Sequence, residues 1–266
     1  MQESKAATAI RHSELIRSGD VEIELERRGG GAPLLLLPSE EALEPDSRFV
    51  AELAKRYEVL ILWPPGFGRS GRPDWVASMD DVAYIYLDIL DRLDLRAIPV
   101  IGCSLGGWIA AEMATKDDAR LDRLVLIDPV GIKIGGPTDR DIQDIWGLHP
   151  QKLAALTWFD ARHGTRDFSA LSDDELTIVA RNAESLARFC WQPYMHNPKL
   201  KHRLHRIAVP TLLVWGESDG IVTPAYGEAY RALIPGAEMT VIREAGHYPH
   251  IEQPAAVGDR LKEFLR

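Results

Sequence analysis

A serine between two glycines is the part of this sequence whose residue types and spacing point most directly to chemistry. Ser104 stands in the run Gly102-Cys103-Ser104-Leu105-Gly106. This G-x-S-x-G pattern is typical of a serine held on a sharp turn between a strand and a helix. Glycines two positions to either side keep side chains out of such a turn. Ser104 is therefore a candidate nucleophile for attack on a carbonyl carbon.

A serine nucleophile requires a base, and His247 is the predicted one among eight histidines. An alcohol is a poor nucleophile at neutral pH, whereas an imidazole has a suitable pKa to take its proton. His247 follows an expected strand near the C-terminus, where loops from the carboxyl ends of parallel strands converge. His250 is the nearest alternative.

The third member of the site should be a carboxylate that follows another strand. Asp219 lies in the turn of Trp215-Gly216-Glu217-Ser218-Asp219, with Glu217 as the neighbouring alternative. Asp128 also follows an expected strand, but its position favours a role in the turn that leaves the sheet. The order Ser104, Asp219, His247 along the chain matches one known arrangement of the catalytic triad.

The elements that must position these residues alternate between short apolar runs and longer amphipathic stretches. This rhythm predicts an α/β fold with a mostly parallel sheet flanked by helices. The expected strands are 13–17, 21–26, 33–37, 59–63, 98–103, 121–128, 209–215 and 238–243. The expected helices around them are 46–56, 79–95, 105–117, 226–233 and 255–266.

The rhythm is interrupted between residues 132 and 205, where helical stretches at 150–160 and 173–189 occur without a convincing strand. We therefore predict a core formed by 1–131 and 206–266 and a helical cap, or lid, at 132–205. Aromatic residues of this insertion are predicted either to line an apolar substrate pocket or to form the core of the cap itself. They are Trp146, Trp158, Trp191 and Tyr194.

Composition favours a globular protein that acts on a small molecule. The chain has 266 residues, of which 45% are hydrophobic, and a net charge of -9. The negative charge disfavours nucleic acid and anionic membranes as partners. A signal peptide and an apolar run of about 18 residues are both lacking, so a cytoplasmic protein is expected. Two cysteines, Cys103 and Cys190, predict neither a disulfide framework nor a metal site.

Four segments together resemble the α/β-hydrolase superfamily from about residue 21 to residue 266. They are Pro65-Gly66-Phe67-Gly68-Arg69-Ser70, Gly102-Cys103-Ser104-Leu105-Gly106-Gly107, Trp215-Gly216-Glu217-Ser218-Asp219 and Ala245-Gly246-His247-Tyr248-Pro249-His250-Ile251-Glu252-Gln253-Pro254. The resemblance implies the α/β-hydrolase fold with an eight-stranded sheet, a cap at 132–205, and neither a metal nor an organic cofactor.

One segment departs from the family pattern, because Leu37 leads into Pro38-Ser39-Glu40 where the family usually has His-Gly. The family alignment gives the backbone N–H groups of Leu105 and Glu40 as the oxyanion hole. A carboxylate pointing at a forming oxyanion opposes it, so Glu40 must turn away, be protonated or have another role. Loss of one such donor typically lowers the rate about 10²- to 10³-fold.

These features predict a serine hydrolase that forms an acyl-enzyme, with small carboxylic esters as the first expected substrate class. A carbon–carbon bond hydrolase of ring-cleavage products is the alternative enzyme. The altered Glu40 segment supports a third hypothesis, a ligand-binding protein of the same fold with little or no turnover.

Overall fold

The computed structural model describes residues 12–40, 47–164 and 167–266, which form an eight-stranded sheet with helices around it. The strands are β1 (His12–Ser18), β2 (Val21–Gly29), β3 (Ala32–Leu37), β4 (Tyr57–Leu62), β5 (Ile98–Cys103), β6 (Leu121–Ile127), β7 (Thr211–Gly216) and β8 (Glu238–Ile242). The α-helices are α1 (Arg48–Leu53), α2 (Met79–Arg92), α3 (Leu105–Lys116), α4 (Pro150–Thr157), α5 (Asp173–Cys190), α6 (Pro224–Ala232), α7 (Pro249–Glu252) and α8 (Pro254–Phe264). The predicted start of the first helix, Asp46, lies outside the described residues.

The strand order β1-β2-β4-β3-β5-β6-β7-β8 confirms the predicted mostly parallel, eight-stranded sheet. A tight hairpin joins β1 to β2, and β2 pairs antiparallel with β4. From β4 onward, every neighbouring pair in the order is parallel. The carboxyl ends of β3 to β8 therefore share one edge of the sheet, which is where a ligand site is expected in this architecture.

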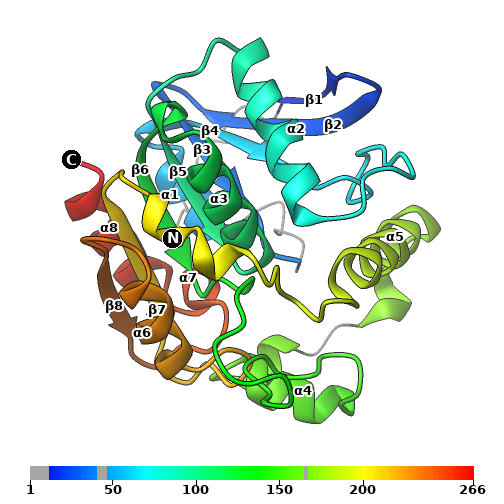
Figure 1. Ribbon diagram of the computed structural model, residues 1–266. Coiled ribbons are helices and arrows are strands. Elements are labelled where there is room, and N and C mark those ends of the chain that lie inside the picture. Colours follow the sequence, from blue (N-terminus) through cyan, green and yellow to red (C-terminus); the bar gives the residue numbers. More distant parts are fainter. Residues whose placement is uncertain (1–11, 41–46, 165–166) are drawn as a thin grey trace, which may run out of the picture.

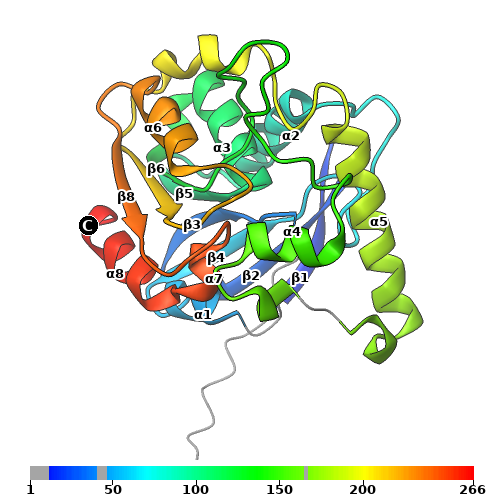
Figure 2. The same ribbon diagram turned by 90° about the horizontal axis from the view of Figure 1, so that it is seen from below.

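Helices cover both faces of the sheet, because the parallel strands bury side chains in two directions (Figures 1 and 2). Helices α2, α3 and α6 pack on one face, and α1 and α8 pack on the other. Successive residues of β3 show the alternation: Leu35 and Leu37 face the first layer, whereas Leu34 and Leu36 face the second. Continuous apolar strands of this kind suit a sheet with two covered faces.

The segment between β6 and β7 is helical throughout its regular elements in the described residues, with α4, α5 and short 3₁₀ turns. Its two ends meet where Gly131 pairs with His196, and Asn197 N–H donates to Gly131 O at 2.9 Å. The longest helix, α5, has 18 residues. Neither it nor another helix in the described part of the chain is long and apolar enough to cross a membrane. The division into a core and a cap stays a prediction.

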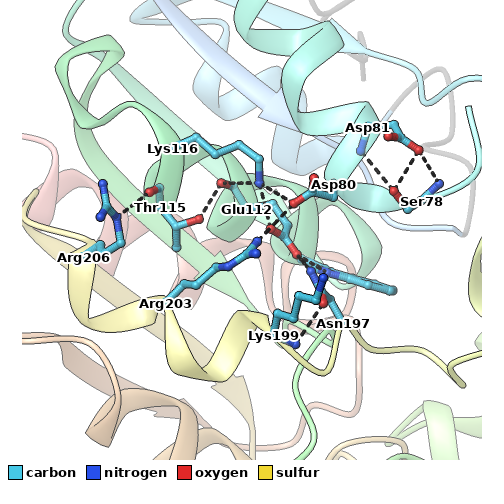
Figure 3. Close-up of polar contacts among 11 residues, drawn as sticks. Ser78, Asp80, Asp81, Glu112, Thr115, Lys116, Asn197, Lys199, Arg203 and Arg206 are labelled. Atoms are coloured by element: carbon cyan, nitrogen blue, oxygen red, sulfur yellow. Dashed lines mark hydrogen bonds and ion pairs between the residues drawn. The ribbon is translucent and has the colours of Figure 1, made fainter.

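Helix α3, which begins directly after Ser104, is anchored at its far end by a buried polar cluster (Figure 3). The Glu112 side chain is fully buried and pairs with Lys116 Nζ at 2.9 Å. Asn197 Nδ2 donates to Glu112 Oε1 at 2.7 Å, which ties the chain returning from the helical segment to α3. Lys116 also pairs with Asp80 at 2.9 Å, linking α2 to the same cluster.

Two arginines near the end of the segment between β6 and β7, Arg203 and Arg206, contact the same cluster and α3. Arg203 pairs with Asp80 at 3.3 Å, and Arg206 donates to Thr115 O at 3.1 Å near the C-terminus of α3. A cation at a helix C-terminus is favourable, because the last carbonyl groups carry partial negative charge. These contacts fix the C-terminal end of α3, the helix that begins directly after Ser104.

Replacing Glu112 with Ala tests the anchor. We expect a loss of about 3 kcal/mol in the free energy of unfolding, because Lys116 and Asn197 lose a buried partner. Urea denaturation measures the loss, with the exposed Glu228 changed to Ala as the matched control. Equal stability of the two variants would contradict the anchoring role.

Candidate active site

Ser104 occupies a strained turn between β5 and α3. Its φ of 47° and ψ of -109° are rare for a residue with a side chain and typical of a catalytic turn. The two flanking glycines make the turn possible, since a Cβ on Gly102 would lie 2.4 Å from Gly106 O. A Cβ on Gly106 would lie 2.1 Å from Leu37 O. The G-x-S-x-G spacing therefore reflects direct backbone contact around the serine.

The three predicted triad residues come together at the carboxyl edge of the sheet. Ser104 Oγ lies 2.8 Å from His247 Nε2, and His247 Nδ1 lies 2.8 Å from Asp219 Oδ2. The N–H groups of Ile221 and Val222 donate to the other carboxylate oxygen, Asp219 Oδ1, at 2.8 and 3.1 Å. With Nδ1–H donated to Asp219, Nε2 is left to accept the serine proton.

The last turn of α4 holds the loops that carry the acid and the base. His247 N–H donates to Thr157 O at 2.6 Å, and Gly220 N–H donates to Leu156 O at 2.9 Å. Glycine is required at position 246, because a Cβ there would lie 2.2 Å from Thr157 O. The helical segment therefore helps to position the loops of Asp219 and His247.

Glu252 also links the His247 loop to the chain that follows α4. Its carboxylate accepts the Gly246 N–H at 2.7 Å and the Asp160 N–H at 3.0 Å. One side chain thus joins the loop that carries the histidine to the chain that follows α4. Sequence reasoning did not assign this role, since the contact joins residues far apart in the chain.

The Glu40 carboxylate lies in the position expected for the oxyanion hole. Its Oε2 accepts the Leu105 N–H at 3.4 Å, and its Oε1 accepts from Ser104 Oγ at 3.2 Å. Tyr248 OH donates to Oε1 at 2.8 Å. Of the three options that the sequence left open, turning away is therefore wrong. The part played by the backbone N–H groups of Leu105 and Glu40 in catalysis stays a prediction.

Asp128 adds a second buried carboxyl group beside the acid of the triad. Gly216 N–H donates to its Oδ1 at 2.9 Å, while Oδ2 has no hydrogen-bond partner among the described residues. Burial first, and then the charge of Asp219, raises the pKa of Asp128 well above its ordinary value. This shift in pKa favours the protonated, neutral form of Asp128, which limits the negative charge next to Asp219.

In the part of the chain that the structure describes, one group of metal-type donors lies close together, and it is in this region. Ligand atoms of Asp128, Asp219 and His247 lie within 4.8 Å of one another. The hydrogen bond between His247 Nδ1 and Asp219 Oδ2 uses two of the atoms that a metal would need.

The residues predicted as alternatives for the acid and the base, Glu217 and His250, lie away from Ser104. Glu217 is exposed at the surface. His250 is buried against Phe49, with ring centroids 5.3 Å apart, and its ring nitrogens have no hydrogen-bond partner among the described residues. Burial, followed by the charge of His247, lowers the pKa of His250 to about 3. The structure therefore links His247, and not His250, to Ser104.

The four predicted pocket aromatics separate into two groups. Trp146 contacts Trp191 and Tyr194, with ring centroids 5.4 and 5.5 Å apart. Trp191 is 64% exposed, which places much of its ring in solvent. Trp158 instead packs on Tyr248 at 4.8 Å, next to the tyrosine that binds Glu40. Their role as a substrate pocket stays a prediction.

Fold and site together define a serine hydrolase. The sequence profile of the Alpha/beta hydrolase family matches residues 34–260, and this chain belongs to that family.

Relatives and solved structures agree with this assignment. A Cupriavidus pinatubonensis (strain JMP 134) protein, named 2-hydroxy-6-oxononadienedioate/2-hydroxy-6-oxononatrienedioate hydrolase, is 26% identical over 94% of this chain and 93% of its own. Naproxen esterase from Bacillus subtilis has a TM-score of 0.75 and 20% identity over 97% of this chain and 92% of that one. A meta-cleavage product hydrolase from Pseudomonas fluorescens IP01 has a TM-score of 0.75 and 21% identity over 95% and 97%. At these identities the two structures show a shared fold.

Asp128→Asn tests the neutral state of the buried acid. The raised pKa means that the folded protein keeps a proton that the unfolded chain releases above about pH 4, so this group lowers stability as pH rises from there. Asparagine keeps the acceptor for Gly216 and removes the titration. We expect the free energy of unfolding of the variant, relative to the wild type, to increase between pH 5 and pH 7.

Urea denaturation at the two pH values measures this difference. Asp122→Asn, at a half-exposed position, is the control and should show no such trend. A constant difference for Asp128→Asn would mean that Asp128 is ionised in the folded protein.

His250→Leu tests the second buried titratable group with the opposite sign. Because the pKa of His250 is lowered to about 3, the unfolded chain binds a proton below about pH 6.5 that the folded protein does not. The wild type therefore loses stability as pH falls through this window. We expect the leucine variant to lose about 2 kcal/mol less between pH 7 and pH 4.5. The exposed His205, changed to Leu, is the control, and equal losses in both variants would contradict the assignment.

Proposed function

We propose that this protein hydrolyses small carboxylic esters through an acyl-enzyme formed on Ser104. The hydrogen-bonded chain from Ser104 Oγ through His247 to Asp219 carries the proposal. It supplies a nucleophile, a base within 2.8 Å and a carboxylate that orients the base.

The proposed reaction has two halves with the same residues. His247 Nε2 takes the hydroxyl proton as Ser104 Oγ attacks the carbonyl carbon, and the Leu105 N–H at the start of α3 stabilises the oxyanion. His247 then protonates the alkoxide leaving group, which leaves an acyl-serine. Water, activated by the same histidine, releases the acid and restores the serine, while Asp219 stabilises the imidazolium in each half.

An apolar or aromatic group in the substrate suits the side chains near the site. Trp158 packs on Tyr248, whose hydroxyl binds Glu40. We propose that residues 132–205, which include Trp158, act as the cap over Ser104, since α4 contacts the loops of both His247 and Asp219. Trp146, Trp191 and Tyr194 then form a second aromatic group of the cap.

Similarity over nearly the whole chain to the Cupriavidus pinatubonensis hydrolase supports a second candidate, hydrolysis of a carbon–carbon bond in a ring-cleavage product. The same triad serves this reaction if the carbon leaving group, in place of an alkoxide, receives the proton. The triad serves both reactions, so esters stay the first proposal and the carbon–carbon bond the second, and the substrates tested below distinguish them.

Ser104→Ala is the direct test. We expect a loss on the order of 10⁴-fold or more in kcat/KM for p-nitrophenyl esters, because the triad acts as a unit. The wild type should be labelled at Ser104 by a fluorophosphonate, as judged by intact-mass and peptide analysis, and the variant should not. Thermal unfolding checks that the variant keeps its fold.

The same assay separates the competing functions. Undiminished hydrolysis by Ser104→Ala would overturn the acyl-enzyme. Turnover of a vinylogous diketone in preference to the esters would select the carbon–carbon hydrolase. Absence of both labelling and turnover in the wild type would select the ligand-binding protein.

A further inference from the structure

Glu40 binds the Leu105 N–H, which the carbonyl oxygen of an acyl substrate needs as a hydrogen-bond donor. Helix α3 starts at Leu105 and has 12 residues, so its first N–H groups carry partial positive charge and favour an anion. In the structure, that anion is the Glu40 carboxylate, which accepts the Leu105 N–H. A substrate carbonyl oxygen can reach this N–H only after the carboxylate has moved.

Glu40 also competes for the proton of the nucleophile. The Ser104 hydroxyl has one hydrogen and two acceptors, His247 Nε2 at 2.8 Å and Glu40 Oε1 at 3.2 Å. A hydroxyl directed to Glu40 does not pass its proton to the histidine. The Tyr248 hydroxyl, 2.8 Å from the same Oε1, holds the carboxylate in this competing position.

The Glu40 carboxylate stands apart from lysine and arginine side chains in the part of the chain that the structure describes. Among the residues that the structure describes, no lysine or arginine pairs with this carboxylate, and the nearest basic nitrogen is His247 Nε2 at 3.9 Å. Only 11% of the side chain is exposed. At so little exposure, a charge interacts more strongly with an incoming charged group than it would in bulk water. Asp219 and the overall charge of -9 add to the negative potential.

We propose that Glu40 is a specificity-determining residue that selects acyl groups with a positive charge close to the scissile carbonyl. A protonated amine on the acyl chain pairs with Glu40 and draws the carboxylate from the Leu105 N–H, which frees that donor for the carbonyl oxygen. Neutral acyl groups must displace Glu40 without such a partner, and anionic acyl groups are repelled. This inference rests on the proposed ester hydrolysis at Ser104.

Three p-nitrophenyl esters with acyl chains of similar length provide the test at pH 7. They are the 3-aminopropanoate, which is cationic, the butanoate, which is neutral, and the hemisuccinate, which is anionic. We expect kcat/KM of the wild type to fall in that order. In Glu40→Gln, which keeps the size and the backbone N–H, the ratio of cationic to anionic ester should fall about 10-fold or more, and the butanoate should be hydrolysed faster.

Two further variants separate the effect of Glu40 from a general effect of charge or of misfolding. Glu217→Gln removes an equal charge from an exposed position and should leave the ratio within twofold. Glu40→Ala is a second variant and should change the ratio in the same direction, and thermal unfolding checks both variants. Spontaneous hydrolysis is measured in buffer without protein and subtracted, and Ser104→Ala is assayed as a separate variant.

An unchanged ratio in both Glu40 variants would overturn the selectivity, as would a proportional loss of activity on all three esters. Wild-type preference for the anionic ester would overturn it as well. Hydrolysis that persists in Ser104→Ala would instead overturn the proposed function, so the two failures are distinguishable.

Discussion

The backbone at Ser104 is the constraint on which the rest of the site depends. A residue with a side chain is held there at a φ of 47°, because β5 ends and α3 begins with no connecting loop. Glycines at 102 and 106 bring the turn into contact with itself and with the end of β3. The energy of this strained conformation is offset by the packing of α3 on the sheet and by the buried polar cluster at its far end. One turn thus presents the hydroxyl and aims the first N–H groups of the helix at the same point.

The remaining parts of the site are brought to Ser104 by the sheet and then held by the helical segment. Parallel strands deliver the loops of Asp219 and His247 to one edge. The end of α4 then accepts a hydrogen bond from each of these loops, and Glu252 joins the histidine loop to the chain after α4. A segment between β6 and β7 therefore contributes to catalytic geometry as well as to any substrate surface. Changes in α4 are expected to reach the triad through backbone contacts.

The second feature of the site is its concentration of carboxyl groups around His247. Three carboxyl groups, those of Glu40, Asp128 and Asp219, lie close to His247 or to its partners. Burial favours the neutral form of Asp128, which limits the negative charge beside Asp219. Glu40 occupies the place of the oxyanion, where an enzyme of this class needs an empty donor. Negative side chains near His247 favour its imidazolium form. One of them, Glu40, also binds the Leu105 N–H.

The sequence by itself determined the α/β architecture, the strand–turn–helix at Ser104 and the identities of the three residues that the structure brings together. These features follow from local patterns, since apolar runs, glycine spacing and the order of elements lie within short stretches of chain. Tertiary structure alone decided where the Glu40 carboxylate points, that Asp128 is buried beside Asp219 and that α4 binds the loops of Asp219 and His247. Glu40 meets Ser104 across 64 residues and Tyr248 across 208. Side-chain direction and burial arise from packing between distant segments, and one-dimensional spacing does not encode them.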